Sequence, residues 1–243
     1  MTYARFHLFF TLPWVAAGLA WQAGTWWMPG PRLSTWITLA IVYGFTCPWD
    51  NWAVARGIWS FPKGRYLFRI RHLPVEEYAF FGLQSLLVIA AVLGLEPWLP
   101  TLPWHPARPA PLWPAGIVLV WSLAGLRLWR WPGRSGRPAY AFHLLFWMVP
   151  ILLLQFALAA DVLLPRLPVL GLVTGAVGGY LTLADLAAVR WGLWLFDERQ
   201  ITGPRLAGVL PWEEAVFFLL TSSLVANSFV MFRQLLHELG VDH

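Results

Sequence analysis

Two acidic blocks each place a pair of carboxyl groups next to a pair of aromatic rings. They read Leu-Pro-Val-Glu-Glu-Tyr-Ala-Phe-Phe and Leu-Pro-Trp-Glu-Glu-Ala-Val-Phe-Phe. On a helix, residues three and four positions apart share a face, so the second Glu would lie beside both rings. Carboxyls transfer protons, and aromatic faces stabilise cations. The blocks therefore favour chemistry through a carbocation, with catalysis assigned to Glu76, Glu77, Glu213 and Glu214 and substrate contacts to Phe80, Phe81, Phe217 and Phe218.

One Glu of each block also has a purely structural explanation. Proline is common at the first position of a helix, and a carboxylate in the first turn favours the helix N-terminus or closes a capping box. This explanation suits Glu76 and Glu213, which would occupy the third position. It leaves Glu77 and Glu214 without a structural reason.

Asp50 and Asp185 each precede a glycine by seven residues. Seven residues are about two helical turns, so each Asp and its glycine are expected to share a face, where the glycine allows a helix or ligand to approach closely. We assign both aspartates to catalysis, with an interhelical hydrogen bond or an ion pair to a loop arginine as the alternative. We assign substrate binding to three neighbouring side chains, although tryptophans also form interfacial belts; the three are Asn51, Trp59 and Trp194.

These blocks recur at nearly constant offsets, which indicates an internal duplication. At an offset of 135, Asp50, Ala53, Val54, Gly57, Trp59 and Phe61 reappear as Asp185, Ala188, Val189, Gly192, Trp194 and Phe196. After a two-residue insertion, the Leu-Pro-x-Glu-Glu blocks match at an offset of 137. The sequence predicts a first three-helix copy over 1–95, a Pro-rich loop and linker helix over 96–138, and a second three-helix copy over 139–243.

The composition is typical of a membrane protein. Hydrophobic residues make up 58% and charged residues 12%, about half the charged fraction of a soluble domain, and the mean hydropathy is +0.59. We expect an all-α bundle of seven transmembrane helices in a 3+1+3 order, with parallel copies. The expected spans are 4–22, 32–50, 75–95, 111–129, 140–160, 167–190 and 211–232.

The basic residues predict the orientation of these spans. With the N-terminus inside, 13 of the 17 basic residues fall on the inner side, as the positive-inside rule requires. The outer side keeps Arg32, Arg108, Arg166 and Arg233. We therefore expect a multi-pass protein of the cell membrane with the N-terminus inside and the C-terminus outside, and a homo-oligomer is left open.

Several other chemistries lack support. Cys47 is the single cysteine, so thiol redox chemistry and a thiolate zinc site are excluded. No Walker A or GxGxxG motif is present, and the histidines and carboxylates show no metal-ligand spacing. Lys63 is the only lysine and lies in a loop, which excludes a retinal Schiff base. We expect no cofactor, no metal and no nucleic-acid partner.

Two pairs of blocks carry a resemblance to a known family. The first pair is PWDNWAVARGIWSF with LPVEEYAFF, and the second is DLAAVRWGLWLF with LPWEEAVFF. In both pairs the chain resembles the membrane lycopene cyclases. This family occurs as two small subunits in some bacteria, as a fused chain in archaea and some bacteria, and as the cyclase part of fungal bifunctional carotenoid enzymes. Pro74, Glu76 and Glu77 match its Pro-x-Glu-Glu motif, as do Pro211, Glu213 and Glu214.

The resemblance implies an isomerase of carotenoid biosynthesis in a bacterial or archaeal membrane. It would convert the linear ends of lycopene, or of other linear carotenoids, to β-rings, giving γ-carotene and then β-carotene without net redox change. Asp50 and Asn51 match the family's Pro-Trp-Asp-Asn signature, whereas the second copy has Ala184, Asp185 and Leu186 there. We therefore expect the two copies to be unequal.

Two other functions stay open from the residues alone. A small-solute transporter also uses 3+1+3 parallel repeats, but it needs a polar cavity that opens in turn to both faces. A carotenoid hydratase would share the acid step and let water capture the cation.

Overall fold

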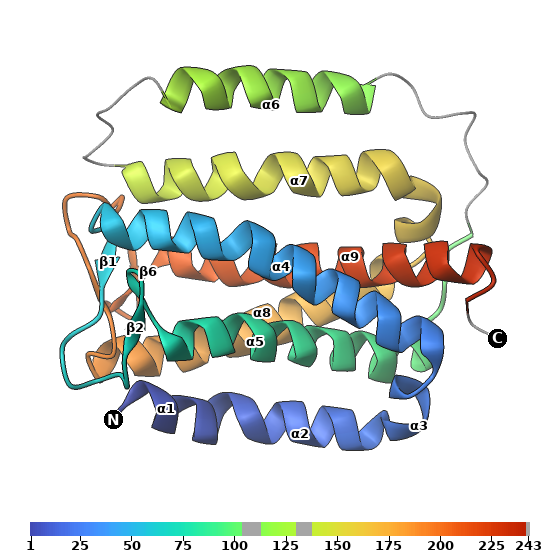
Figure 1. The fold of residues 1–243 in the computed structure, drawn as a ribbon, viewed down its shortest axis with the longest axis horizontal. Coiled ribbons are helices and arrows are strands. Elements are labelled where there is room, and N and C mark those ends of the chain that lie inside the picture. Colours follow the sequence, from blue (N-terminus) through green and yellow to red (C-terminus); the bar gives the residue numbers. More distant parts are fainter. Residues whose placement is uncertain (104–112, 130–137, 242–243) are drawn as a thin grey trace.

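The computed structural model describes residues 1–103, 113–129 and 138–241, which form a bundle of long helices with a common axis direction (Figure 1). Parts of the expected Pro-rich loop and linker lie outside these residues, including the prolines at 107, 109 and 111 and Arg108, Arg130, Arg134 and Arg137. The helical segments are α1 Tyr3–Phe6, η1 His7–Thr11, α2 Leu12–Trp21, α3 Ala23–Trp26, α4 Pro29–Ala55, α5 Val75–Leu95, η2 Glu96–Trp98, α6 Trp113–Trp129, α7 Ala139–Leu163, α8 Leu167–Arg190 and α9 Trp212–Glu238.

Four helical segments of the described chain are long and apolar enough to cross a membrane. They are Val75–Trp98, which joins α5 and η2, and the helices α7, α8 and α9. The other three predicted ranges are also helical, but α6 is shorter, α4 is less apolar, and the first range is broken into α1, η1 and α2. The chain is thus mostly helical and has the apolar helices of a membrane protein.

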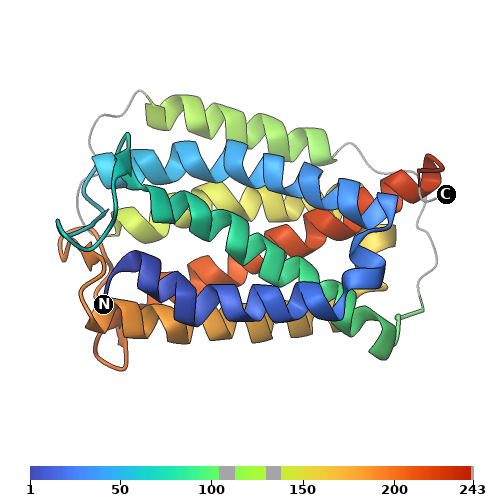
Figure 2. The same ribbon diagram turned by 60° about the horizontal axis from the view of Figure 1, so that its bottom comes forward.

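The third helix of each copy lies at the centre of the bundle. In the first copy α5 packs on α2 and α4, and in the second α9 packs on α7 and α8. The copies are joined crosswise, because α4 also packs on α9 and α8 on α5 (Figures 1 and 2). Helix α6 packs on α7 at the edge of the bundle (Figure 1).

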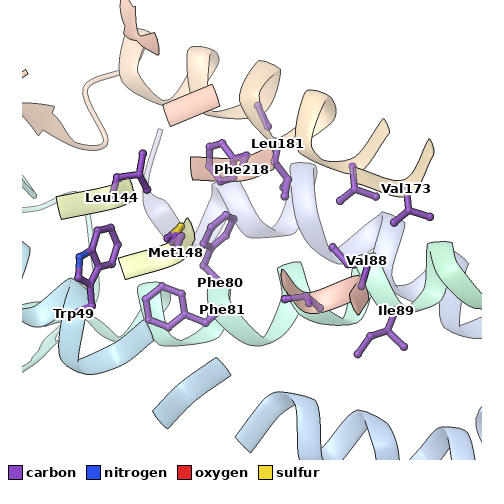
Figure 3. Close-up of a cluster of buried hydrophobic side chains, with 14 of the residues drawn as sticks. Trp49, Phe80, Phe81, Val88, Ile89, Leu144, Met148, Val173, Leu181 and Phe218 are labelled. Carbon is purple, nitrogen blue, oxygen red and sulfur yellow. The ribbon is translucent and has the colours of Figure 1, made fainter. Parts of the chain in front are cut away.

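The two central helices meet through residues at equivalent positions. Gln84 Nε2 of α5 donates to Thr221 Oγ1 of α9 over 2.7 Å, and the two residues are 137 positions apart, which is the repeat offset. Val88 and Val225, also one offset apart, are both buried nearby. Figure 3 shows a cluster of buried apolar side chains from both copies, Val88 among them. A quasi-twofold axis therefore passes between α5 and α9.

The described chain is consistent with the expected all-α membrane fold, and three short two-stranded antiparallel ladders, which the sequence did not predict, cap one end of the bundle. Two are hairpins within a copy: β2 Arg69–Ile70 with β3 Leu73–Pro74, and β5 Arg205–Leu206 with β6 Leu210–Pro211. The third joins the copies, since β1 Trp59–Ser60 pairs with β4 Leu195–Phe196. The N-terminus lies at this end and the C-terminus at the other (Figure 1).

The glycines of the Asp blocks do not have the predicted role. Helix α4 ends at Ala55 and α8 at Arg190, so Gly57 and Gly192 lie beyond the helices rather than on a shared face with the aspartates. Their φ angles of +70° and +64° are left-handed, as is usual for a glycine that ends a helix. A Cβ on Gly57 would have no neighbour closer than 4.0 Å, so no close approach occurs there.

The prolines of the acidic blocks also differ from expectation. Pro74 and Pro211 end β3 and β6 rather than starting helices, and α5 and α9 begin one residue later. Each glutamate pair therefore lies at the second and third helical positions, directly after a hairpin. This places Glu77 and Glu214 at the capped end of the bundle.

Candidate active site

A cavity of about 50 Å³ lies at the strand-capped end of the bundle, between the two copies. This is room for a few water molecules. The helices α1, α4, α5, α7, α8 and α9 supply parts of its wall, together with β1, β4, the residue after β1 and the residue before β4. The lining residues are Tyr3, Phe6, Asp50, Trp59, Phe61, Glu77 and Phe80 of the first copy and Tyr140, Leu181, Asp185, Trp194, Phe196, Glu214, Phe217 and Phe218 of the second.

Four of the six predicted catalytic carboxyls meet in this cavity. Asp50, Asp185 and Glu214 are buried, and Glu77 is half-buried. The four groups lie close enough to interact electrostatically. In the described part of the chain, the ion pairs involve Glu96 and Glu198, and none reaches a cavity carboxyl. The cavity thus gathers acidic groups in an aromatic surrounding without a paired cation.

Each cavity glutamate accepts a hydrogen bond from a tyrosine that sequence reasoning missed. Tyr3 Oη donates to Glu77 Oε2 over 2.7 Å, and Tyr140 Oη donates to Glu214 Oε1 over 2.5 Å. Both tyrosines are almost fully buried. A signal for them does exist in the sequence, because Tyr3 and Tyr140 are separated by the same 137 residues as Glu77 and Glu214.

The rings around the tyrosines repeat the same geometry. Tyr3 stacks on Phe61 at 6.2 Å between ring centroids and tilts against Trp194 at 5.1 Å. Tyr140 stacks on Phe196 at 6.2 Å and tilts against Trp59 at 5.4 Å. Each tyrosine therefore packs on the phenylalanine of its own copy and on the tryptophan of the other. The predicted substrate residues Trp59 and Trp194 lie in the cavity wall for this reason.

The predicted phenylalanines divide unequally. Phe80, Phe217 and Phe218 line the cavity, and Phe80 meets Phe218 edge to face at 6.1 Å (Figure 3). Phe81 is buried but lies outside the lining, with its ring against Tyr43 and Tyr78. Of the phenylalanines in the acidic blocks, the cavity therefore has one from the first copy and two from the second.

The two aspartates differ in their partners. Trp194 Nε1 donates to Asp185 Oδ1 over 2.8 Å. Both side-chain oxygens of Asp50 are buried with no hydrogen-bond partner in the described structure, although Trp59 is the counterpart of Trp194. Buried polar groups without partners are costly and uncommon in native proteins. Asp50 is thus the less stabilised of the two carboxyls.

Glu76 and Glu213 do not join the cavity, although both are buried. Glu76 Oε1 accepts from the backbone N–H of Leu67 over 2.8 Å, and Glu213 Oε1 accepts from that of Thr202 over 2.7 Å. Leu67 and Thr202 are one repeat offset apart. In both copies, the first Glu of the motif fixes the loop that leads into the hairpin.

Asn51 also lies outside the cavity lining. Its Nδ2 donates to the carbonyl oxygen of Cys47 and to the Tyr78 hydroxyl, and its Oδ1 accepts from the backbone N–H of His72. This amide fixes the turn of the β2–β3 hairpin, where Arg71 has a φ of +56°. The second copy has Leu186 instead, so the fixation is specific to the first copy.

His7 is a further residue that sequence reasoning did not select. It starts the π-helical turn η1, its ring stacks on Tyr3 at 4.8 Å, and its Nε2 lies 2.9 Å from the Glu76 carbonyl oxygen. Leu144 takes its place in the second copy, so the repeat gives no signal for it. π-Turns often occur at functional sites.

No cluster of three His, Cys, Asp or Glu side chains suited to a metal ion occurs among the described residues. Carboxyls beside aromatic faces can transfer protons and stabilise a positive charge. Those are the groups needed to form, stabilise and quench a carbocation.

Comparisons with known proteins identify relatives that are named lycopene cyclases. The lycopene beta-cyclase of Halobacterium salinarum is 31% identical over 197 residues, which cover 81% of this chain and 80% of that protein. The bifunctional lycopene cyclase/phytoene synthase of Phycomyces blakesleeanus is 27% identical over 93% of this chain and 38% of its own length, and that of Phaffia rhodozyma 28% identical over 93% and 36%.

No family model matches the chain, and no solved structure does. The similarity to the archaeal protein nevertheless extends over most of both sequences. From this similarity we conclude that the chain belongs to the lycopene cyclase family.

Proposed function

We propose that the protein is a lycopene β-cyclase, an isomerase that closes the linear ends of lycopene into β-rings without net redox change. The observation that carries this proposal is the cavity in which four carboxyls from two copies meet aromatic rings. The names of the relatives indicate the same reaction. The first product is monocyclic γ-carotene, and a second round gives β-carotene.

In this mechanism a carboxyl donates its proton to the terminal double bond of the substrate and leaves a tertiary cation. The neighbouring double bond attacks this cation, which closes the ring and moves the positive charge into it. A carboxylate then removes a ring proton to form the new double bond. One proton is gained and one is lost, so the product is an isomer and no electron donor or acceptor is consumed.

The cavity side chains take complementary parts in this proposal. Asp50, Glu77, Asp185 and Glu214 transfer protons, and the rings of Phe80, Phe217 and Phe218, with Trp59 and Trp194, stabilise the cation. Because acid and base share one cavity, the proton can return from base to acid between turnovers. Glu76 and Glu213 hold the loops instead.

The substrate would enter from the lipid. A linear carotenoid is about as long as the bilayer is thick, about 30 Å, so one end at a time reaches the cavity. The enclosed volume is about 50 Å³, which means that aromatic side chains must move aside when a chain end enters.

We further propose seven spans in a 3+1+3 arrangement, with the N-terminus and the strand-capped end inside the cell. The loop between α4 and α5 supports this orientation, since it carries Arg56, Lys63, Arg65, Arg69 and Arg71. Single cysteines at Lys63 and Leu239 in a Cys47→Ser background should react with impermeant reagents from opposite faces of the membrane. Labelling from the same face would contradict the topology.

The decisive experiment is expression in cells that accumulate lycopene, followed by chromatography and mass measurement of the pigments. A cyclase forms cyclic isomers of unchanged mass, a hydratase forms products heavier by water, and a transporter leaves lycopene unaltered. Purified protein in lipid, fed lycopene anaerobically without flavin or nicotinamide, should still form the cyclic isomer. A strict cofactor requirement, or the absence of cyclic product, would contradict the proposal.

A further inference from the structure

We propose that Tyr3 and Tyr140 are positioning residues for proton transfer. Each holds the cavity glutamate of its own copy in place and stabilises the carboxylate that exists while that glutamate lacks its proton. The inference rests on the proposed cyclase function and deepens it. It concerns a hydroxyl that acts through a carboxyl, and not a group that reacts with the substrate.

The first support is that the pairing occurs twice with the same connectivity. Tyr3 and Glu77 are separated by 74 residues, and Tyr140 and Glu214 by the same number. In each copy the bond joins the start of the first helix to the start of the third. The flanking residues differ, since Glu77 is followed by Tyr78 and Glu214 by Ala215, yet the bond is kept in both.

The second support is that packing alone does not require the hydroxyl. The rings of Tyr3 and Tyr140 already fill their places by stacking on Phe61 and Phe196. A phenylalanine would make the same ring contacts without burying a polar atom. The hydroxyls are therefore explained by their bonds to the carboxyls.

The third support is a series of hydrogen bonds that links both glutamates of the motif. In the first copy Glu76 holds the backbone of Leu67, the carbonyl oxygen of Arg65 accepts from the backbone N–H of Tyr3 over 2.7 Å, and the Tyr3 hydroxyl holds Glu77.

The second copy repeats the series through Glu213, Thr202, the Gln200 carbonyl, Tyr140 and Glu214, with 2.9 Å between Tyr140 N and Gln200 O. The tyrosine is thus fixed at its backbone and at its hydroxyl. The first Glu of the motif acts on the second through this loop and this tyrosine.

Such a fixed donor suits a carboxyl that changes charge during each turnover. In an apolar cavity a carboxylate lacks the hydration that water would give it, and a preorganised hydroxyl replaces part of that stabilisation without having to reorient. The tyrosine hydroxyl therefore stabilises the deprotonated carboxyl, both after the acid has released its proton and before the base has captured one. Removing it should slow chemistry more than it weakens substrate binding.

The test uses Tyr3→Phe and Tyr140→Phe in the full-length protein in lipid, with Tyr180→Phe as the matched control. The Tyr180 hydroxyl donates to the Phe10 carbonyl oxygen over 2.6 Å, and Tyr180 does not line the cavity. We expect kcat to fall on the order of 10- to 100-fold in at least one cavity variant, with KM for lycopene changed by less than about threefold. Wild-type kcat in both cavity variants, or an equal loss in the control, would overturn the proposal.

A double-mutant cycle separates positioning from general loosening. Glu77→Asp keeps a carboxyl but shortens it beyond the reach of Tyr3, so adding Tyr3→Phe should cost little further activity if the tyrosine acts through Glu77. The corresponding pair is Glu214→Asp with Tyr140→Phe. Losses that multiply independently in both cycles would show that the tyrosines act elsewhere.

Infrared difference spectroscopy reads the bond without turnover. A carboxyl band that disappears in Glu77→Gln belongs to Glu77, and it should shift in Tyr3→Phe but keep its frequency in Tyr180→Phe. An unshifted band would overturn the pairing. A wild-type protein that forms no cyclic carotenoid would instead refute the proposed function, so the two failures are distinguishable.

Discussion

The two copies have the same supporting structure around unequal reacting groups. In both, a glutamate fixes a loop, the loop fixes a tyrosine, and the tyrosine binds the second glutamate. The aspartates differ, since Asp185 is bonded to Trp194 and Asp50 has no partner in the described structure. The cyclisation that we propose needs a proton donor and a proton acceptor, which are different tasks, and we propose that this inequality within a repeated frame provides for both.

A second difference lies outside the cavity wall. Asn51 and His7 occur only in the first copy, where the one fixes the β2–β3 turn and the other binds the backbone of Glu76. The second copy has Leu186 and Leu144 at these positions. The first copy therefore has polar contacts around its loop and first helix that the second lacks.

The largest expected effect separates the cavity glutamates from the loop glutamates. Changing Glu77 and Glu214 singly to Gln should lower turnover by a factor on the order of 10² or more in at least one case, because proton transfer is lost while shape is kept. Glu76→Gln and Glu213→Gln should lose less turnover and instead lower the temperature of thermal unfolding. Pigment chromatography and unfolding in detergent measure the two effects.

This division is wrong if all four variants fold and cyclise lycopene at the wild-type rate. In that case the carboxyls would only start helices and hold loops.

The next effect tests the unpartnered aspartate. Asp50→Asn should lower turnover on the order of 10²-fold and leave the unfolding temperature unchanged or higher, because no hydrogen bond of Asp50 is broken in the described structure. Asp185→Asn serves as the matched variant, because asparagine keeps the Oδ1 atom that accepts from Trp194. A marked loss of stability in Asp50→Asn would reveal a partner for Asp50 and remove the difference between the copies.

Replacement of the two tryptophans should give a smaller, unequal effect. Trp194→Phe removes the donor of Asp185, whereas Trp59→Phe removes no hydrogen bond of Asp50. We expect turnover to fall about 10-fold in Trp194→Phe, as for the loss of a charge-assisted hydrogen bond, and by less in Trp59→Phe. Equal losses in a steady-state assay would mean that both tryptophans act only through their rings.

Replacing Asn51, whose hydrogen bonds lie outside the cavity, should lower stability more than turnover. Asn51→Leu copies the second repeat into the first and leaves the His72 backbone N–H without its acceptor. The cost should be about 1–3 kcal/mol of stability, measured by denaturation in mixed micelles. Leu186→Asn is the reciprocal control and should not stabilise the second copy, since the matching turn there has a different length.

The smallest effect is a pH dependence confined to the loop of the second copy. Asp197 accepts from the backbone N–H of Arg199 and from Gln200 Nε2, which hold the pKa of its carboxyl below the usual range. This contribution to stability is present above the unfolded pKa of about 3.9 and is lost as pH falls through the lower folded value. The first copy has Pro62 at this position.

Hydrogen exchange of the two loops should therefore diverge in acid. The protection against exchange after Asp197, relative to the intrinsic exchange rate at each pH, should fall below about pH 4, and Asp197→Asn should abolish that pH dependence. An acid-induced change of the same size in the loop of the first copy would assign the effect to other groups.

Much of the helical fold could be predicted because long apolar runs are a strong signal. The ends of the helices were less predictable: α4 continues to Ala55 because its last turns pack against the loops, and the first range is interrupted by a π-turn at His7. The ladder between β1 and β4 has two residues on each strand, which is too short for an alternating pattern to reveal.

The site was predictable as far as the repeat carried it. The alignment of the copies found the four cavity carboxyls, and the helix-start argument set Glu76 apart from Glu77. That argument did not find the actual partner of Glu76, because the loop that folds back onto it comes from nine residues earlier in the chain. Tyr3 lies 74 residues from its partner, and only the tertiary fold brings the two together. Asn51 matched a family signature, yet its bonds support a turn.

The contact between Gln84 and Thr221 at the quasi-twofold axis has a consequence for the origin of such a chain. Consider a symmetric dimer of two identical subunits, each equivalent to one half of this chain. A residue on its twofold axis faces the same residue of the other subunit, so both sides carry the same group. Here an amide faces a hydroxyl, a directional pair that a symmetric dimer of identical halves cannot form. Joining the halves in one chain frees each position to diverge from its counterpart. An ancestral pair of identical subunits would have had two equal aspartates, so the difference between Asp50 and Asp185 could arise only after that symmetry was lost.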